Sequence, residues 1–303
     1  MELPTISPAE LRRRSRGILL GIACGEASSG SLAFTNLALE LGESLVGRGA
    51  VEPELLLGRW ARLGPPSRRP PGSITARAVR LFQEGFPADG LADGAARLVP
   101  DRSGDGPLAR ALPLAVAGRR DGAQLKQWAN QSAWVTHSDL TSRMATVGSC
   151  LLARDLLTRS LEESLARVAQ ALREEAPLRL ARAFRKPSRG EGPEPGDDAV
   201  AVLSQASHAL AGSSDIEDVL QEVENEGRPT DGLLALAGGL GGAAFGIDPS
   251  SPRLSSLDPG FRLRLETLAD QLVDFEVQFH SRHLDAAGRY SSPVKAAGGN
   301  SNG

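Results

Sequence analysis

The chain has 303 residues, of which 41% are hydrophobic and 23% charged, and its 34 basic and 37 acidic residues give a net charge of -3. Charges of both signs are interspersed and aromatic residues make up only 4%, which argues against a nucleic-acid-binding surface, because such a surface needs a basic face and rings for stacking. No break in composition divides the chain, so we expect one domain over residues 1–287 and a disordered tail over 288–303.

The N-terminal segment can be compared with a signal peptide, because four arginines between residues 12 and 16 precede the apolar run Gly17–Gly25. Glu26 interrupts that run, and Ser7–Glu10 has the pattern of a helix start, with an N-cap serine, a proline and a capping-box glutamate. An ordinary first helix is therefore the favoured interpretation. The apolar run Leu233–Ile247 is shorter than the roughly 20 residues of a membrane span. We expect no membrane partner and a cytoplasmic location.

Helical spacing of apolar residues recurs along the chain, and strand-like alternation is almost absent. Capping-box patterns at Ser160–Glu163 and Ser214–Glu217 predict two helix starts. A further helix is predicted over residues 198–210, with Gly212 placed to end it, and Arg262–Phe279 predicts the last long helix. Breaks rich in proline and glycine separate these segments. The pattern predicts an all-α fold.

Common catalytic signatures are missing from the sequence. It contains no G-x-S-x-G elbow, no phosphate-binding G-x-x-x-x-G-K-[ST] loop, no H-E-x-x-H pair and no cysteine cluster. Cys24 and Cys150 are the only cysteines, and each lies in an apolar run without ligand-spaced neighbours. We predict that both are buried structural thiols.

Six segments, taken in order, resemble motifs of the ADP-ribosylglycohydrolase family, which includes the dinitrogenase reductase-activating glycohydrolases. They are GILLGIACGEA at Gly17–Ala27, LALELGESLV at Leu37–Val46, GSITARAVRLFQEG at Gly72–Gly85, SGDGPLARALPLAV at Ser103–Val116, SAWVTHSD at Ser132–Asp139 and GRPTDGLLALAGGLGGAAFG at Gly227–Gly246. Each motif alone is weak, but six in the right order are strong. The resemblance covers about residues 15 to 275 and implies an all-α fold around a central cleft.

The resemblance also implies a chemistry, in which two Mg²⁺ ions in the cleft bind the ribose hydroxyls and a water while the bond at the anomeric carbon of ADP-ribose is cut. The family's first metal motif, T-D-D-T, falls here on Leu32–Thr35, and both carboxylates are replaced. The second, D-T-D-T, falls on Pro229–Gly232; it keeps only one of its two carboxylates, Asp231, and loses its terminal hydroxyl. Mg²⁺ requires several hard oxygen ligands. We therefore predict a degenerate metal site with Asp231 as a vestigial ligand, Glu26 as a further candidate ligand, and no cofactor.

The remaining candidate ligand-binding residues also come from the matched motifs: Ser103, Gly104, Asp105, Gly106, His137 and Asp139. The glycine loop resembles the family's phosphate-contacting loop, with Asp105 in place of asparagine, but the same residues could form an ordinary turn. His137 could line the cleft or be a hydrogen-bonded packing residue. Arg110 could offset the charge of Asp105 or form a structural ion pair, and Asp231 or the preceding threonine could simply cap a helix.

Three functions stay open on this sequence. The favoured hypothesis is a catalytically degenerate homologue, a pseudoenzyme, whose cleft still binds ADP-ribose, another nucleotide or an ADP-ribosylated protein. One alternative is an active hydrolase of N- or O-glycosidic ADP-ribosyl bonds with a rearranged Mg²⁺ site. The other is a structural or partner-binding protein with a filled cleft.

Overall fold

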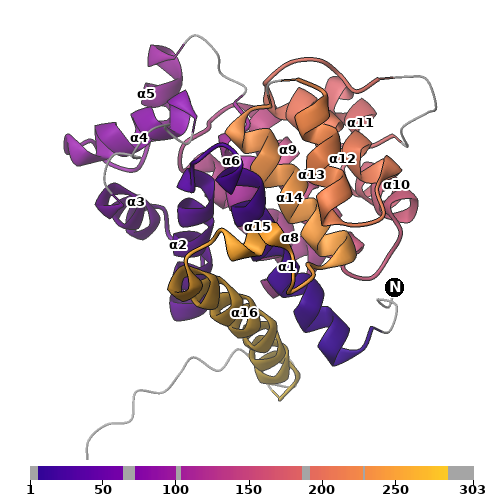
Figure 1. Cartoon of the computed structure of the whole chain (residues 1–303). Helices are drawn as coiled ribbons and strands as arrows, with labels where there is room; N and C mark the ends of the chain where they lie inside the picture. Colours follow the sequence, from indigo (N-terminus) through magenta and orange to yellow (C-terminus); the bar gives the residue numbers. More distant parts are fainter. Residues whose placement is uncertain (1–5, 64–71, 100–103, 186–191, 228, 286–303) are drawn as a thin grey trace, which may run out of the picture.

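The computed structural model describes residues 6–63, 72–99, 104–185, 192–227 and 229–285. These residues form helices and connecting turns, and the only extended pairing among them is an isolated bridge between Gly104 and Asp198. The predicted all-α class is confirmed, and Figure 1 shows the helices gathered into one body. The predicted tail over residues 288–303 lies outside the described residues.

The helices follow one another in this order: α1 Pro8–Ala27, α2 Ala33–Arg48, α3 Pro53–Arg62, α4 Ser73–Gln83, α5 Leu91–Leu98, α6 Gly106–Arg110, α7 Pro113–Ala117, α8 Gly122–Trp134, α9 Leu140–Leu156, α10 Leu161–Ala171, α11 Leu178–Ala183, α12 Ala199–Gly212, α13 Ile216–Asn225, α14 Asp231–Phe245, α15 Pro252–Ser255 and α16 Pro259–Asp285. The Arg262–Phe279 prediction lies within α16, and the predicted end near Gly212 matches the last residue of α12. Within the described chain, no helix has the length and apolar character needed to cross a bilayer.

The centre of the fold is the contact between α1 and α14, which pack backbone against backbone. A Cβ atom placed on Gly21 would overlap the carbonyl oxygen of Gly238 and lie 2.7 Å from its carbonyl carbon. Equivalent overlaps occur where Gly17 meets Gly242 and where Gly25 meets Leu234. Glycine is therefore required along both helices, because any side chain would force the two backbones apart. This close approach explains the glycine-rich composition of α14.

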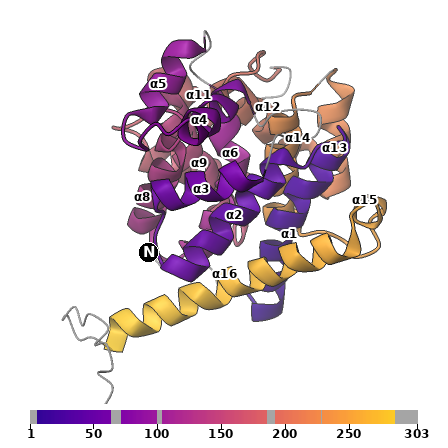
Figure 2. The ribbon, with the colours of Figure 1, turned by 90° about the vertical axis from the view of Figure 1, so that its left-hand side faces the viewer.

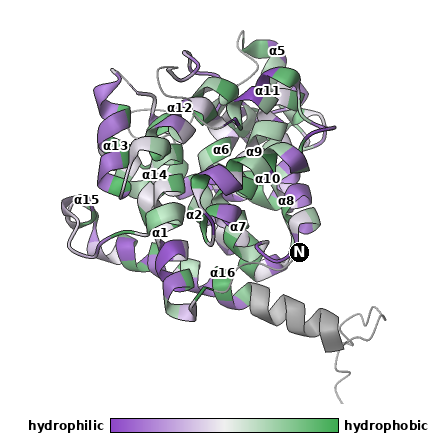
Figure 3. Cartoon of the chain, turned by 90° about the vertical axis from the view of Figure 1, so that its right-hand side faces the viewer, coloured by the Kyte–Doolittle hydropathy of each residue, from purple (hydrophilic) through white to green (hydrophobic). Residues whose placement is uncertain are grey.

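Other helices surround this pair. Helices α12 and α13 pack beside α14, while α16 runs across α1, α2 and α7 and extends past the rest of the body in Figure 2. Arginines of α1 anchor α16 through ion pairs, notably Arg16 to Asp270 at 2.6 Å and Arg12 to Asp274 at 2.6 Å. Figure 3 shows hydrophilic residues on the outward turns of α13 and α16. These outer helices are amphipathic, whereas α14 is almost entirely buried.

The helix starts in the structure can be compared with the capping boxes predicted from the sequence. Ser160 and Glu163 form the predicted capping box of α10. The predicted box at Ser214–Glu217 is wrong by one residue: Asp215 is the N-cap of α13 and accepts a hydrogen bond from the backbone N–H of Asp218 at 2.8 Å. Two neighbouring residues, Ser214 and Asp215, can both cap, and the apolar face of the helix selects the one that buries Ile216.

The remaining local predictions concern the N-terminus and the cysteines. Ser7 caps α1 as predicted, but Glu10 does not complete the predicted capping box, because its carboxylate accepts from Arg13 and Arg14 instead. Cys24 and Cys150 are both buried free thiols, which confirms the prediction. Burial raises the pKa of Cys24 to about 12 and also raises that of Cys150.

Candidate functional site

Glu26, the last buried residue of α1, places its carboxylate at the N-terminus of α2. The chain turns back through Gly30, whose φ of 75° suits a residue without a side chain. Oε1 of Glu26 then accepts from the backbone N–H of Phe34 at 2.8 Å, and Oε2 accepts from the backbone N–H of Thr35 at 2.8 Å and from its hydroxyl at 2.7 Å. A fourth bond joins Ser31 Oγ to Oε1 at 3.2 Å. Glu26 thus caps α2 from outside that helix.

The cap is needed because Leu32, at the N-cap position of α2, offers no side-chain acceptor. Burial raises the pKa of Glu26, and the four hydrogen bonds act in the opposite direction. Phe34 is itself buried, only 3% exposed, so an apolar ring occupies one of the first-motif positions. Each carboxylate oxygen of Glu26 already accepts two hydrogen bonds from the protein.

The second motif lies at the start of α14, close to the first. Thr230 is the N-cap, and its hydroxyl accepts from the backbone N–H of Leu233 at 3.0 Å. Asp231 is therefore the first residue of the helix and not its cap, and it is partly buried. The backbone of Gly25 touches Leu234 in the first turn of α14, so the end of α1 that carries Glu26 lies beside the start of α14.

The glycine loop before α6 reaches the same place. Thr230 Oγ1 donates to Oδ2 of Asp105 at 3.4 Å, and Asp105 lies directly over Gly232. On the other side of the loop, Ser142 Oγ donates to the carbonyl oxygen of Gly104 at 3.0 Å. The loop therefore joins the start of α14 to the start of α9. Ser103, the first candidate of this loop, lies outside the described residues.

His137 packs beneath the loop. Its side chain is 2% exposed, and Nδ1 lies 2.7 Å from Thr136 Oγ1. A Cβ atom on Gly104 would lie 3.1 Å from His137 Nε2, and one on Gly106 would lie 3.2 Å from its Cε1. Burial, with the nearby positive charge of Arg110, holds the pKa of His137 well below its ordinary value. The imidazole is therefore neutral at physiological pH.

The surroundings of Arg110 differ from those predicted from the sequence, which were the carboxylate of Asp105 or another ion-pair partner. It is fully buried, donates to Thr75 Oγ1 at 2.9 Å and to Thr136 Oγ1 at 2.7 Å, and lies over the ring of Trp60 at 4.6 Å. Burial lowers the pKa of Arg110 to about 9. Among the hydrogen bonds and ion pairs of the described residues, none joins Arg110 to a carboxylate. The expected pairing with Asp105 or another acid is thus replaced by hydroxyls and an aromatic face.

Asp139 begins α9. Its Oδ1 accepts from the backbone N–H of Ser142 at 2.8 Å, while its buried Oδ2 has no hydrogen-bond partner among the described residues. Burial raises the pKa of Asp139 above its ordinary value. One turn on, Arg143 lies over the half-exposed ring of Trp134 at 4.1 Å. Asp139 thus acts as a helix cap and keeps one oxygen for a further donor.

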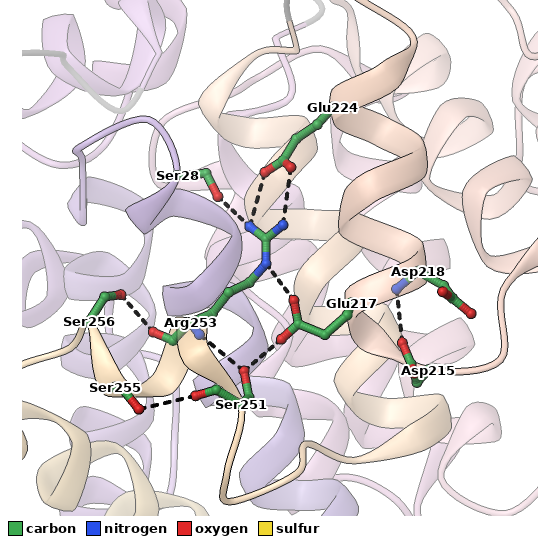
Figure 4. Close-up of polar contacts among 9 residues, drawn as sticks. All are labelled: Ser28, Asp215, Glu217, Asp218, Glu224, Ser251, Arg253, Ser255 and Ser256. Atoms are coloured by element: carbon green, nitrogen blue, oxygen red, sulfur yellow. Dashed lines mark hydrogen bonds and ion pairs between the residues drawn. The ribbon is translucent and has the colours of Figure 1, made fainter.

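A charged cluster around Arg253 holds the turn that follows Glu26 (Figure 4). The guanidinium of Arg253 donates to Glu217 at 2.7 Å and to both carboxylate oxygens of Glu224 at 3.0 and 3.1 Å. Both glutamates belong to α13. The same group donates to Ser28 Oγ, and Ser251 Oγ donates to the other oxygen of Glu217. These contacts tie α15 to α13 and to the turn between α1 and α2. Sequence reasoning missed the cluster, because its residues are distant in the chain and match no motif.

The site as a whole brings together most of the predicted residues. Glu26 and the start of α14 lie side by side, and the loop of Asp105 contacts both the start of α14 and His137. Asp139 is connected to this loop through Ser142, whose backbone N–H donates to Asp139 and whose hydroxyl donates to Gly104. Over the described parts of the chain, no group of three or more His, Cys, Asp or Glu side chains is arranged to hold a metal ion.

The all-helical fold and the order of these segments define a class of protein, and comparison with known families identifies it. A sequence profile of the ADP-ribosylglycohydrolase family matches residues 7–279, so the chain belongs to this family. The chain is 25% identical to ADP-ribosylarginine hydrolase Tri1 of Pseudomonas putida (strain GB-1) over 306 residues, which cover 89% of this chain and 80% of the relative. A solved structure described as an ADP-ribosylglycohydrolase-related protein complex superposes with a TM-score of 0.71 at 26% identity, over 88% of this chain and 99% of that chain.

Proposed function

We propose that this chain is a non-hydrolysing member of the ADP-ribosylglycohydrolase family, a cytoplasmic pseudoenzyme whose site binds ADP-ribose, a related nucleotide or an ADP-ribosylated protein. The observation that carries the proposal is the cap that Glu26 makes on α2. The carboxylate of Glu26 accepts from the backbone N–H groups at the N-terminus of α2, so it is already engaged with donors of the protein. A buried phenylalanine stands next to it.

The donor set does not fit two Mg²⁺ ions. Mg²⁺ prefers six oxygen ligands in octahedral geometry and gives up its waters reluctantly. For Glu26 to bind a metal, an oxygen that already accepts two hydrogen bonds from the protein would have to release at least one of them, from a hydroxyl or from a backbone N–H group of α2. Asp231 is the only carboxylate that remains from the two motifs, and a single carboxylate does not hold a pair of dications.

Residues that could still contact a ligand are present in the same region. The backbone of Gly104–Gly106, the neutral His137 and the free Oδ2 of Asp139 offer donors and acceptors without a metal. The relative from Pseudomonas putida is named for ADP-ribosylarginine. ADP-ribose and ADP-ribosylated arginine are therefore the ligands to test first.

The test combines hydrolysis with binding. Purified protein is incubated with an ADP-ribosylarginine peptide and excess Mg²⁺, and released ADP-ribose is measured by chromatography; calorimetric titration with ADP-ribose follows, with and without Mg²⁺. We expect no release above the protein-free control and binding that is independent of Mg²⁺. Asp231→Ala should leave both results unchanged, as should Asp248→Ala, a surface acid used as the matched control.

Other outcomes would identify the alternatives. Mg²⁺-dependent release that is lost in Asp231→Ala and kept in Asp248→Ala would refute the proposal and indicate a hydrolase with a rearranged metal site. The absence of both release and binding would refute the ligand-binding part. That result would favour a structural or partner-binding protein, for which the buried Phe34 is the relevant observation.

A further inference from the structure

A cavity lies at the opposite end of α14 from the candidate site. Its volume of about 540 Å³ falls within the range of about 300–1,000 Å³ that is typical of small-molecule sites. It lies where α9, α12 and α14 end and α10 begins. Helix α14 has 15 residues, so its two ends are about 20 Å apart at 1.5 Å per residue. The cavity is therefore separate from the site around Glu26 and Asp231.

Apolar side chains from four helices line this cavity. They are Leu156 of α9, Leu161 of α10, Leu210 of α12 and Phe245 of α14. Leu156 and Leu210 are buried, so they form the floor rather than an exposed rim. A ligand with an apolar body would lose contact with water here, which favours binding.

Two arginines line the same cavity, and the first of them has structural partners. Arg14 Nε donates to Glu10 at 2.6 Å, and its Nη1 donates to the carbonyl oxygens of Leu156 and Leu157 at 3.1 and 3.4 Å. Carbonyl groups at the C-terminus of a helix lack partners within the helix, and basic side chains can supply them. Arg14 thus pairs with an acid of its own helix and caps the end of α9.

Arg159, the second arginine, lies in the turn between α9 and α10 and is partly buried. Among the described residues, its guanidinium makes one side-chain hydrogen bond, from Nη1 to Thr158 Oγ1 at 3.1 Å, and no ion pair. A guanidinium carries five N–H donors in a planar fork that matches carboxylate and phosphate groups. The cavity therefore combines an apolar wall with a cation that no acid of the described chain neutralises.

We propose that this cavity is a second ligand site, which binds a small amphipathic anion. The apolar body of the ligand packs against the leucines and Phe245, and its carboxylate or phosphate group pairs with Arg159. The inference does not rest on the proposed function, because the two sites share no residue.

Calorimetric titration of the full chain tests the site with octanoate, octyl phosphate and octanol, which share one apolar body and differ in the headgroup. We expect at least one of the two anions to bind, and octanol to bind about tenfold more weakly or less. Arg159→Gln should weaken anion binding by about tenfold or more, because it removes the charge and keeps a polar side chain. Arg173→Gln, at an exposed arginine outside the cavity, is the matched control and should change the affinity by less than about twofold.

A second variant locates the ligand. Ala211 lines the cavity and is exposed, so Ala211→Trp should fill the cavity and abolish anion binding while the urea unfolding midpoint stays near that of the wild type. Absence of binding by both anions would overturn the inference, as would binding that Arg159→Gln and Ala211→Trp leave unchanged. Octanol binding as tightly as the anions would overturn it too, because the cavity would then be merely apolar. A preference for one of the two anions would support the inference and identify the headgroup.

Discussion

Replacing Glu26 by glutamine should destabilise the protein severely, whether or not Mg²⁺ is present. The glutamine amide keeps one acceptor oxygen and replaces the other by an NH₂ group. Whichever way the amide is placed, it turns donors toward a backbone N–H of α2, either that of Phe34 or that of Thr35. The hydroxyl of Thr35 can rotate and become the acceptor, but a backbone N–H cannot.

The magnitude follows from the bonds lost. A buried donor left without a partner costs about 1–3 kcal/mol, and hydrogen bonds to a charged group contribute about 1.5–3 kcal/mol each. We expect a loss of about 3–5 kcal/mol in the free energy of unfolding. For a chain of this size each kcal/mol corresponds to about 2–4 °C, so the Tm should fall by about 6–20 °C.

The assay is urea and thermal unfolding followed by far-UV circular dichroism, each with and without excess Mg²⁺. Glu43→Gln is the matched control: it lies on the same helix α2 and pairs with Arg264 at the surface, where an ion pair contributes at most about 1 kcal/mol. A Glu26→Gln variant within about 0.5 kcal/mol of the wild type would refute the capping role. Destabilisation that appears only in the presence of Mg²⁺ would refute it as well, since it would make Glu26 a metal ligand.

Three further predictions concern packing, pH and thiol chemistry. Gly21→Ala should cost about 3 kcal/mol or more in urea unfolding, whereas Gly47→Ala on an exposed helical turn should cost nothing; equal effects would contradict the backbone contact of α1 with α14. Because the folded-state pKa of His137 is well below the ordinary 6.5, its contribution to stability should be complete above pH 6.5 and decline as the pH falls, by at most about 1.4 kcal/mol per pH unit. Unfolding curves from pH 7 to 5 should show this slope and His137→Gln should lose it; a slope kept in the variant would point to other groups. Cys24 and Cys150 should react with a thiol reagent at pH 8 only after unfolding, and fast labelling of the native protein would contradict their burial.

Much of the fold could be predicted from the sequence, because the helical spacing of apolar residues and the N-capping patterns both indicate where helices lie. The start of α10 was placed correctly from a single capping box, since Ser160 has no competing neighbour. The start of α13 was misplaced by one residue, because Ser214 and Asp215 are adjacent and each is followed three residues later by an acid. The identity of a cap depends on which register buries the apolar face, and that register is decided by packing against α14 and α12.

The candidate site could be predicted only in part, because sequence shows which residues replace a motif but not what the replacements do. Leu32–Thr35 lacks carboxylates in the printed sequence, whereas the role of Glu26 depends on a turn that returns its side chain to a helix beginning seven residues later. Glu26 is a candidate metal ligand by its position in the first matched segment, Gly17–Ala27. Its four hydrogen bonds give it a structural role as the cap of α2.

A common physical logic connects the carboxylates of the candidate site. Helix N-termini attract negative charge, and around the candidate site carboxylates of the chain serve the starts of α2 (Glu26), α14 (Asp105, through Thr230) and α9 (Asp139). Only in Glu26 do both carboxylate oxygens already accept two hydrogen bonds each, so a metal ion at Glu26 would have to displace at least one of them. Under the proposed function, building a metal site would therefore require more than adding acids to Leu32–Thr35. It would first require a new cap for α2, so that Glu26 could leave it.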